Sequence, residues 1–233
     1  MTKKINKKKA APKDVIVEPI NFTIDLSEIC DILNVELKPN FASLGVDIAQ
    51  KRTGLCLLRT DTTKLYMDEL FLIDIKGTGK GNLHQRLLDY YKQAAVFVNR
   101  LNNTSCYDAV EKIVIIEDCW FGLNVWTTKV LAKFATMSFV TFMKWTKNIP
   151  DPIGPDTARR RIGFEQDRGK FTFQLIDDGQ DVTRKKVWDR KPLQVKDQVK
   201  NFLEDKLDLT IEDDNLADAF VLSLAGLINA KTV

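Results

Sequence analysis

The chain has 233 residues, of which 44% are hydrophobic and 29% charged, with a formal net charge of +3. This length suits one large domain with an extra segment or arm, and the hydrophobic share is enough to bury a core. The only histidine is His84, which argues against a zinc site or a Ser/His/Asp triad, so any metal chemistry must use carboxylates. The four cysteines show no metal-ligand spacing and are interpreted as reduced thiols.

No apolar run approaches the roughly 20 residues that span a bilayer, and no secretory signal opens the chain. We therefore expect a soluble intracellular protein that does not associate with membranes.

The charge is unevenly distributed. Residues 1–13 hold six lysines and no acid, and removing them from the 35 basic residues leaves 29 against 32 acidic ones. We expect a disordered basic tail attached to a slightly acidic body. Such a tail is either a solvated lysine run or an arm attracted to a polyanion such as DNA.

The first half of the chain is predicted to contain both strands and helices. Residues 14–40 form an N-terminal extension with a short helix, which a capping-box pattern of Asp25 and Glu28 predicts. Two strands joined by a tight polar turn follow at 41–61, and a third lies at 64–75. Later elements are predicted from apolar spacing: a helix at 83–101, a strand buried on both faces at 110–118, and a long helix from Val125 to Thr146.

The second half is mainly helical. A short strand or turn and a basic helix are predicted at 148–164, and two helices close the chain at 191–206 and 215–229. Residues 165–190 are polar without clear periodicity, apart from a possible hairpin at 170–182. The order predicts an α/β fold whose sheet begins antiparallel and continues with parallel strands.

Three acids stand in apolar surroundings, where a charge is costly. Asp47 lies inside an apolar strand, Glu117 ends another, and Asp218 lies within the apolar final helix. Each could be a structural polar group with its own partner. With few cations nearby in sequence, we instead expect the three to converge on divalent metal, because hard cations such as Mg²⁺ take oxygen ligands.

Four segments resemble, in order, the RuvC-type Holliday junction resolvases. "LGVDIAQKRTGLCLL" is similar to the first strand-turn-strand of that family, and "IVIIEDCWFGLNVWTTKVLAKFATMSFVTF" to its strand ending in glutamate with the following long helix. "KDQVKNFLEDKL" resembles its lysine-bearing helix, and "DNLADAFVLSL" its terminal helix. The resemblance covers residues 41–230 and leaves out residues 1–40 and an insertion around 165–190.

The resemblance implies an RNase H-like fold, with a mixed central sheet flanked by helices, over 41–233. It also implies that Asp47, Glu117 and Asp218 hold two Mg²⁺ ions, with Asp47 bridging them and Mn²⁺ able to substitute. The family places its fourth acid three residues before the last one, where this chain has Asn215. We expect Asp214 to be the fourth ligand. Asn215, through its amide oxygen, and a plain helix-capping role for Asp214 stay open.

Further residues are carried over from the same resemblance. Lys196 falls where the family keeps a lysine near the scissile phosphate, although a surface lysine is the simpler interpretation. Trp120, with Phe121 as an adjacent alternative, falls where the family presents an aromatic ring to bases, and core packing is the simpler role for either. Arg159, Arg160 and Arg161 fit contacts with backbone phosphates.

These features predict a metal-dependent, structure-selective endonuclease that resolves four-way DNA junctions by paired phosphodiester hydrolysis. Because a four-way junction has two-fold symmetry, we expect a homodimer. Two alternatives stay open. One is an RNase H-like nuclease acting on other branched DNA or on structured RNA. The other is a junction-binding protein without catalysis, which the asparagine at 215 motivates.

Overall fold

The computed structural model describes residues 22–75, 82–118, 125–177 and 182–229, the side chains of 174–184 excepted. The strands are β1 (Thr23–Asp25), β2 (Phe41–Asp47), β3 (Arg52–Thr60), β4 (Lys64–Asp74), β5 (Glu111–Glu117), β6 (Asp151–Ile153), β7 (Lys170–Asp177) and β8 (Val182–Arg190). The helices are α1 (Leu26–Leu33), α2 (Leu83–Asn102), α3 (Val125–Thr146), α4 (Pro155–Arg161), α5 (Val195–Leu207) and α6 (Asp214–Leu227), with a 3₁₀ turn, η2, at Ser105–Tyr107.

Six strands form one mixed sheet in the order β1-β4-β3-β2-β5-β6. The strands from β1 to β2 pair antiparallel, whereas β5 pairs parallel with both β2 and β6. The α/β fold with an antiparallel start and later parallel strands, predicted from the sequence, is therefore confirmed. The remaining two strands, β7 and β8, pair only with each other.

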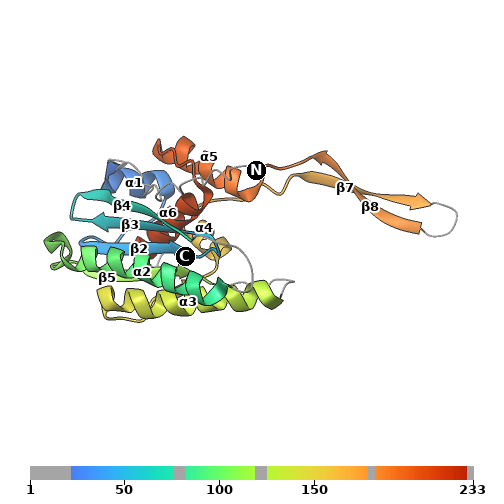
Figure 1. The fold of residues 1–233 in the computed structure, drawn as a ribbon. Coiled ribbons are helices and arrows are strands. Elements are labelled where there is room, and N and C mark those ends of the chain that lie inside the picture. The colour runs from blue at the N-terminus through green and yellow to red at the C-terminus, as the bar shows by residue number, and fades with distance from the viewer. Residues whose placement is uncertain (1–21, 76–81, 119–124, 178–181, 230–233) are drawn as a thin grey trace, which may run out of the picture.

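Helices cover both faces of the sheet (Figure 1). On one face α2 and α3 bury large aromatic residues such as Tyr90 and Phe134 against alternate strand residues, among them Leu44 and Val46. On the other face α1, α4, α5 and α6 form a second core. Because side chains alternate along a strand, the residues of β2 next to Leu44 and Val46 face α6 instead.

The final helix, α6, lies directly on the backbone of the sheet. A Cβ added at Gly45 would come within 2.0 Å of the Ala219 carbonyl oxygen, and one at Gly54 within 2.1 Å of the Asn215 carbonyl oxygen. The Ser223 hydroxyl donates a hydrogen bond of 2.6 Å to the carbonyl of Ser43. All residues from Leu216 to Leu227 are buried, as their apolar sequence predicts.

Two elements differ from the sequence-based expectations. Strand β1, which pairs with β4 at the sheet edge, was not predicted, because three residues are too few to show a periodicity. The hairpin is longer than the predicted 170–182, since β8 continues to Arg190. Among the described residues no helix is long and apolar enough to cross a membrane.

Candidate active site

The carboxyl ends of two neighbouring parallel strands bring Asp47 and Glu117 together. In the register of β2 and β5, Val46 lies opposite Ile116, so the next residue of each strand is an acid. Val46 and Ile116 both pack in the core beneath α2 and α3, and alternation therefore turns both acids toward the α6 face. The register of β2 and β5 thus places these two acids next to each other at the same edge of the sheet.

Asp47 is held in an unfavourable electrostatic position. Its side chain is buried, with 5% of the residue exposed. Burial, a side-chain hydrogen bond with Glu117, and the negative charges of Glu117 and Asp218 raise the pKa of Asp47 well above its usual range, while Lys196 opposes the shift. A carboxyl pKa raised in this way marks a place where nearby positive charge does not offset the negative charge.

Asp218 reaches the same region from α6, but two cations already compensate it. The Arg159 guanidinium, from α4, donates to Asp218 Oδ1 at 2.8 Å, and Lys196 Nζ, from α5, lies 3.7 Å from Asp218 Oδ2. The premise that cations are scarce is therefore wrong for Asp218. No local sequence pattern indicates the Arg159–Asp218 pair, because the two residues are 59 positions apart on different helices.

Arg159 is turned inward and not along the surface. Its side chain is 12% exposed, its second contact is with Asp156 at 3.4 Å, and its Nε has no hydrogen-bond partner among the described residues. Arg160, the next residue, is exposed, and its hydrogen bonds to described residues stay within its own helix, at Asp156 and Thr157. Of these two arginines, Arg160 has the guanidinium available to a phosphate.

Asp213 and Asp214, at the start of α6, have different roles. Asp213 is the N-cap, accepting from the backbone N–H groups of Asn215 and Leu216 at 3.0 and 3.2 Å. The alternative of a non-helical capping Asp214 is thus wrong, because Asp214 is the first helical residue. Its half-exposed carboxylate pairs with Lys200 Nζ at 2.8 Å.

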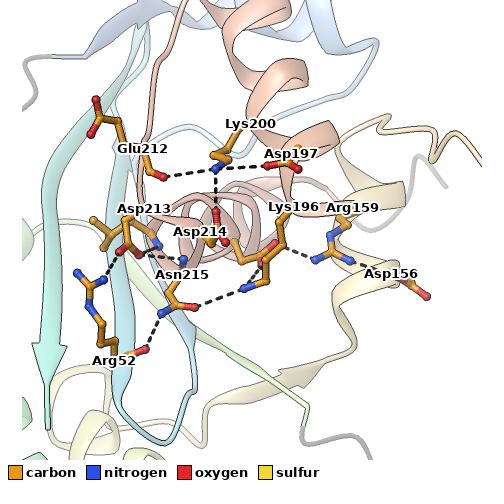
Figure 2. Close-up of polar contacts among 12 residues, drawn as sticks. Arg52, Asp156, Arg159, Lys196, Asp197, Lys200, Glu212, Asp213, Asp214 and Asn215 are labelled. Carbon is orange, nitrogen blue, oxygen red and sulfur yellow. Dashed lines mark hydrogen bonds and ion pairs between the residues drawn. The ribbon is translucent and has the colours of Figure 1, made fainter. Parts of the chain in front are cut away.

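Asn215 faces the other way. Its amide nitrogen donates to the Arg52 carbonyl at 2.8 Å, and its Oδ1 accepts from Lys196 Nζ at 3.5 Å (Figure 2). Lys196 therefore lies between Asn215 and Asp218, with 44% of its side chain exposed. This lysine stands at the edge of the acid group with its charge open to solvent. Trp120 and Phe121 lie outside the described residues.

The acids fit a metal only in part in the arrangement seen. Within the described part of the chain, no group of three or more acidic, histidine or cysteine side chains is close enough to hold a metal ion. The Asp47–Glu117 pair fits a hard cation, because it offers carboxylate oxygens where positive charge is short. Asp218 and Asp214 are held by Arg159 and Lys200, so they could join the pair only by giving up these partners.

Comparisons with known proteins bear on the fold. No protein-family model matches the sequence, and no curated protein matches it. Among solved structures, Thermus thermophilus RuvC in complex with a Holliday junction substrate is 12% identical, with a TM-score of 0.52 over 79% of this chain and 91% of that chain. A second structure of Thermus thermophilus RuvC is 13% identical, with the same TM-score over 81% of this chain and 99% of that one. The yeast mitochondrial Holliday junction resolvase Ydc2 is 11% identical over 85% and 82% of the two chains, with a TM-score of 0.46. The likeness to RuvC shows that this chain has an RNase H-like fold.

Proposed function

We propose that this chain is a metal-dependent endonuclease that hydrolyses phosphodiester bonds in branched DNA, with four-way junctions as its preferred substrate. The observation that carries the proposal is the buried Asp47 carboxyl against Glu117 at the ends of two parallel strands, with Asp218 close enough to raise the Asp47 pKa. The fold likeness to RuvC, solved with a Holliday junction substrate, supports the choice of DNA.

Each residue has a role in this proposal. Asp47 and Glu117 would hold the divalent ion, Mg²⁺ or Mn²⁺, and Asp218 and Asp214 would complete a two-ion site after releasing their cations. When bound, such ions lower the pKa of a water molecule and stabilise charge on phosphate oxygens. Lys196, exposed at the edge of the acids, would neutralise the phosphate beside the cleaved bond.

Further parts of the proposal concern the whole assembly. We propose that the domain spans 41–233, with residues 1–13 as a basic tail and 14–40 as an extension. Paired cleavage of a two-fold symmetric junction needs two active sites related by the same symmetry, so we propose a homodimer. Trp120 or Phe121 would stack on a base, and Arg160 and Arg161 would contact backbone phosphates.

The test uses purified protein with end-labelled four-way, flap and linear duplex DNA, in Mg²⁺, Mn²⁺ or EDTA. We expect cleavage of the four-way junction that requires metal and leaves paired nicks. Asp47→Asn and Glu117→Gln should each lower the rate by orders of magnitude while junction binding persists. Glu111→Gln, at the exposed opposite end of the same strand as Glu117, is the matched control and should cleave normally. Wild-type rates in Asp47→Asn would refute the assignment.

One observation favours a second candidate. Arg159 pairs with Asp218 and Lys200 pairs with Asp214. The two carboxylates of α6 therefore have their negative charges compensated without a metal ion. A protein that binds junctions without cleaving them fits this arrangement. Tight junction binding with no cleavage in either metal would select it. Faster cleavage of flaps or structured RNA would instead identify another RNase H-like nuclease.

A further inference from the structure

The β7–β8 hairpin extends away from the body of the protein. Its two strands pair antiparallel along their whole length, from Lys170 opposite Arg190 to Asp177 opposite Val182, and neither joins the central sheet. Figure 1 shows it as a two-stranded ribbon that points away from the layers of helix and sheet. An isolated two-stranded ribbon of this kind buries little of its own surface. Large apolar side chains that stay exposed on it therefore indicate a binding surface.

One face of the ribbon carries exposed aromatic rings around a lysine. Phe171 lies opposite Trp188 and Phe173 opposite Lys186, so these four side chains share a face. The three aromatic residues are 41%, 38% and 52% exposed in the order Phe171, Trp188 and Phe173. Lys186 Nζ lies 3.7 Å from the ring centroid of Phe171 and 3.9 Å from that of Trp188. Aromatic rings interleaved with cations suit stacking on bases and pairing with phosphates.

The second strand is also strongly basic. β8 contains Arg184, Lys185, Lys186 and Arg190 against a single acid, Asp189. A surface of this charge attracts a polyanion. It also disfavours contact with the same ribbon of a second copy, because like charges would be brought together.

The root of the ribbon is fixed to the helix that carries Lys196. Arg190 forms a two-pronged ion pair with Asp167, one contact of which is 2.8 Å. The Gln198 side chain, on α5, accepts from the Asp167 N–H at 2.8 Å and donates to its carbonyl at 3.0 Å. Gly169 has a φ of +68°, and a Cβ there would come within 2.5 Å of the Arg190 carbonyl oxygen. The ribbon thus starts from a defined point two residues along α5 from Lys196.

We propose that the β7–β8 ribbon is a second nucleic-acid binding site. It would bind branched DNA through its aromatic face and the lysines of β8, away from the Asp47–Glu117 pair. The inference rests on the proposed function, since it takes DNA as the partner. Anchorage to α5 gives the ribbon a set direction relative to Lys196, so DNA held on it enters the acid site in a restricted orientation.

The test compares a variant that lacks aromatic rings on one face of the ribbon with a variant altered on the opposite face. Phe173→Ala/Trp188→Ala removes two exposed rings, whereas Thr172→Ala/Val187→Ala alters an opposed pair on the other side of the same ribbon. Binding to a labelled four-way junction is measured by fluorescence anisotropy in EDTA, where cleavage is excluded. Removing the rings should weaken binding by at least about tenfold, and the control pair should stay within about twofold of wild type.

Three outcomes separate this inference from the function on which it rests. Circular dichroism and melting temperature verify that both double variants are folded. Wild type that binds no branched DNA contradicts the proposed function itself. Wild type that binds, with unchanged affinity in Phe173→Ala/Trp188→Ala, overturns the ribbon alone. A change of oligomeric state in that variant, measured by light scattering, would identify the ribbon as a contact between copies and also overturn the inference.

Discussion

The carboxylate of Asp218 is tolerable inside an apolar helix because Arg159 and Lys196 bring positive charge to it. Both side chains of the Arg159–Asp218 pair are only 12% exposed, so solvent screens the pair weakly. Removing one partner of such a pair leaves a buried charge that has lost its main compensation. The same contact that stabilises the fold also occupies the oxygen that a metal would need.

Arg159→Gln should therefore lower the free energy of unfolding in EDTA by about 3 kcal/mol. The double variant Arg159→Gln/Asp218→Asn should lose less than the two single changes together, because it removes both charges. Urea denaturation measures each value, and Arg160→Gln on the exposed side of α4 should change little. Strict additivity of the two single changes would mean that the pair does not compensate Asp218.

A second prediction at this scale concerns the raised pKa of Asp47. The pKa of an aspartate in an unfolded chain is about 3.9. In the folded protein, burial and the contact with Glu117 raise the pKa of Asp47. Between these two values the folded state binds more protons, so stability falls as pH rises. Asp47→Asn removes this penalty, and its melting temperature in EDTA should exceed that of wild type at pH 7. The gain should vanish toward pH 3.

Asp61 provides a control, because its pKa is shifted in the direction opposite to that of Asp47. Hydrogen bonds from the Thr63 N–H, the Tyr66 hydroxyl and the Lys64 N–H lower its pKa. Asp61→Asn should therefore lose stability, and more so above pH 4 than below it, because the charged form is the one favoured by the fold. A gain in Asp47→Asn that is independent of pH would show that charge is not its origin.

Changes of charge can test the proposed fourth metal ligand. If Asp214 is the ligand, Asp214→Asn should lower cleavage by orders of magnitude and Asn215→Ala should cost little. If Asn215 is the ligand, the order reverses and Asn215→Asp stays active or improves, because a carboxylate binds a hard cation better than an amide does. Cleavage against Mg²⁺ concentration measures both. Asp197→Asn, which also contacts Lys200, is the control for that lysine. Full activity in Asp214→Asn and Asn215→Ala excludes both residues.

At the scale of elements, the glycines of the sheet determine how closely α6 can approach. Gly45 sits in β2 two residues before Asp47, beneath the Ala219 carbonyl of α6. A side chain there would push the helix away from the strand that ends at Asp47. The position of Asp218 over the acids therefore depends on the absence of a methyl group at Gly45.

Gly45→Ala should destabilise the fold by 3 kcal/mol or more, at the upper end of the ~1–3 kcal/mol typical of overpacking, because the obstructing atoms are backbone. Urea denaturation measures the loss. Gly154→Ala is the matched control, since a Cβ there meets only Thr157 Oγ1 at 3.9 Å and the Gly154 φ of −67° suits alanine. Equal stability of the two variants would mean that α6 is free to shift.

The elements that could be predicted are those with a long, uniform pattern. The β2–β3 pair, β5 and the 22-residue α3 are each marked by a largely apolar run, and the structure confirms them. β8 was only partly predicted, because its charged residues hide the alternation that β7 shows. The meeting of Asp47 and Glu117 depends on the parallel pairing of β2 with β5, and the Arg159–Asp218 pair depends on how α4 packs on α6. No local pattern records either arrangement.

At the scale of the whole molecule, positive charge is unevenly distributed. The body is slightly acidic once residues 1–13 are set aside, and its basic residues gather on α4 and β8. In the proposed function, attraction to DNA phosphates is therefore divided among the tail, α4 and the ribbon. Because Coulomb attraction does not distinguish branched from linear DNA, the proposed preference for a junction would have to come from the arrangement of these parts and of the two proposed active sites.

The tail itself, outside the described residues, gives the last prediction. Each of its six lysines should displace a counterion when it contacts a phosphate. Each such contact makes the slope of log K against log salt more negative by ~0.9. Deleting residues 1–13 should flatten that slope by up to about 5, as measured by anisotropy from low to physiological salt. A full-length variant with the six lysines changed to glutamine should behave alike, which separates charge from length. Preference for the four-way junction over linear duplex should survive both changes. An unchanged slope in the truncated protein would mean that the tail does not contact DNA.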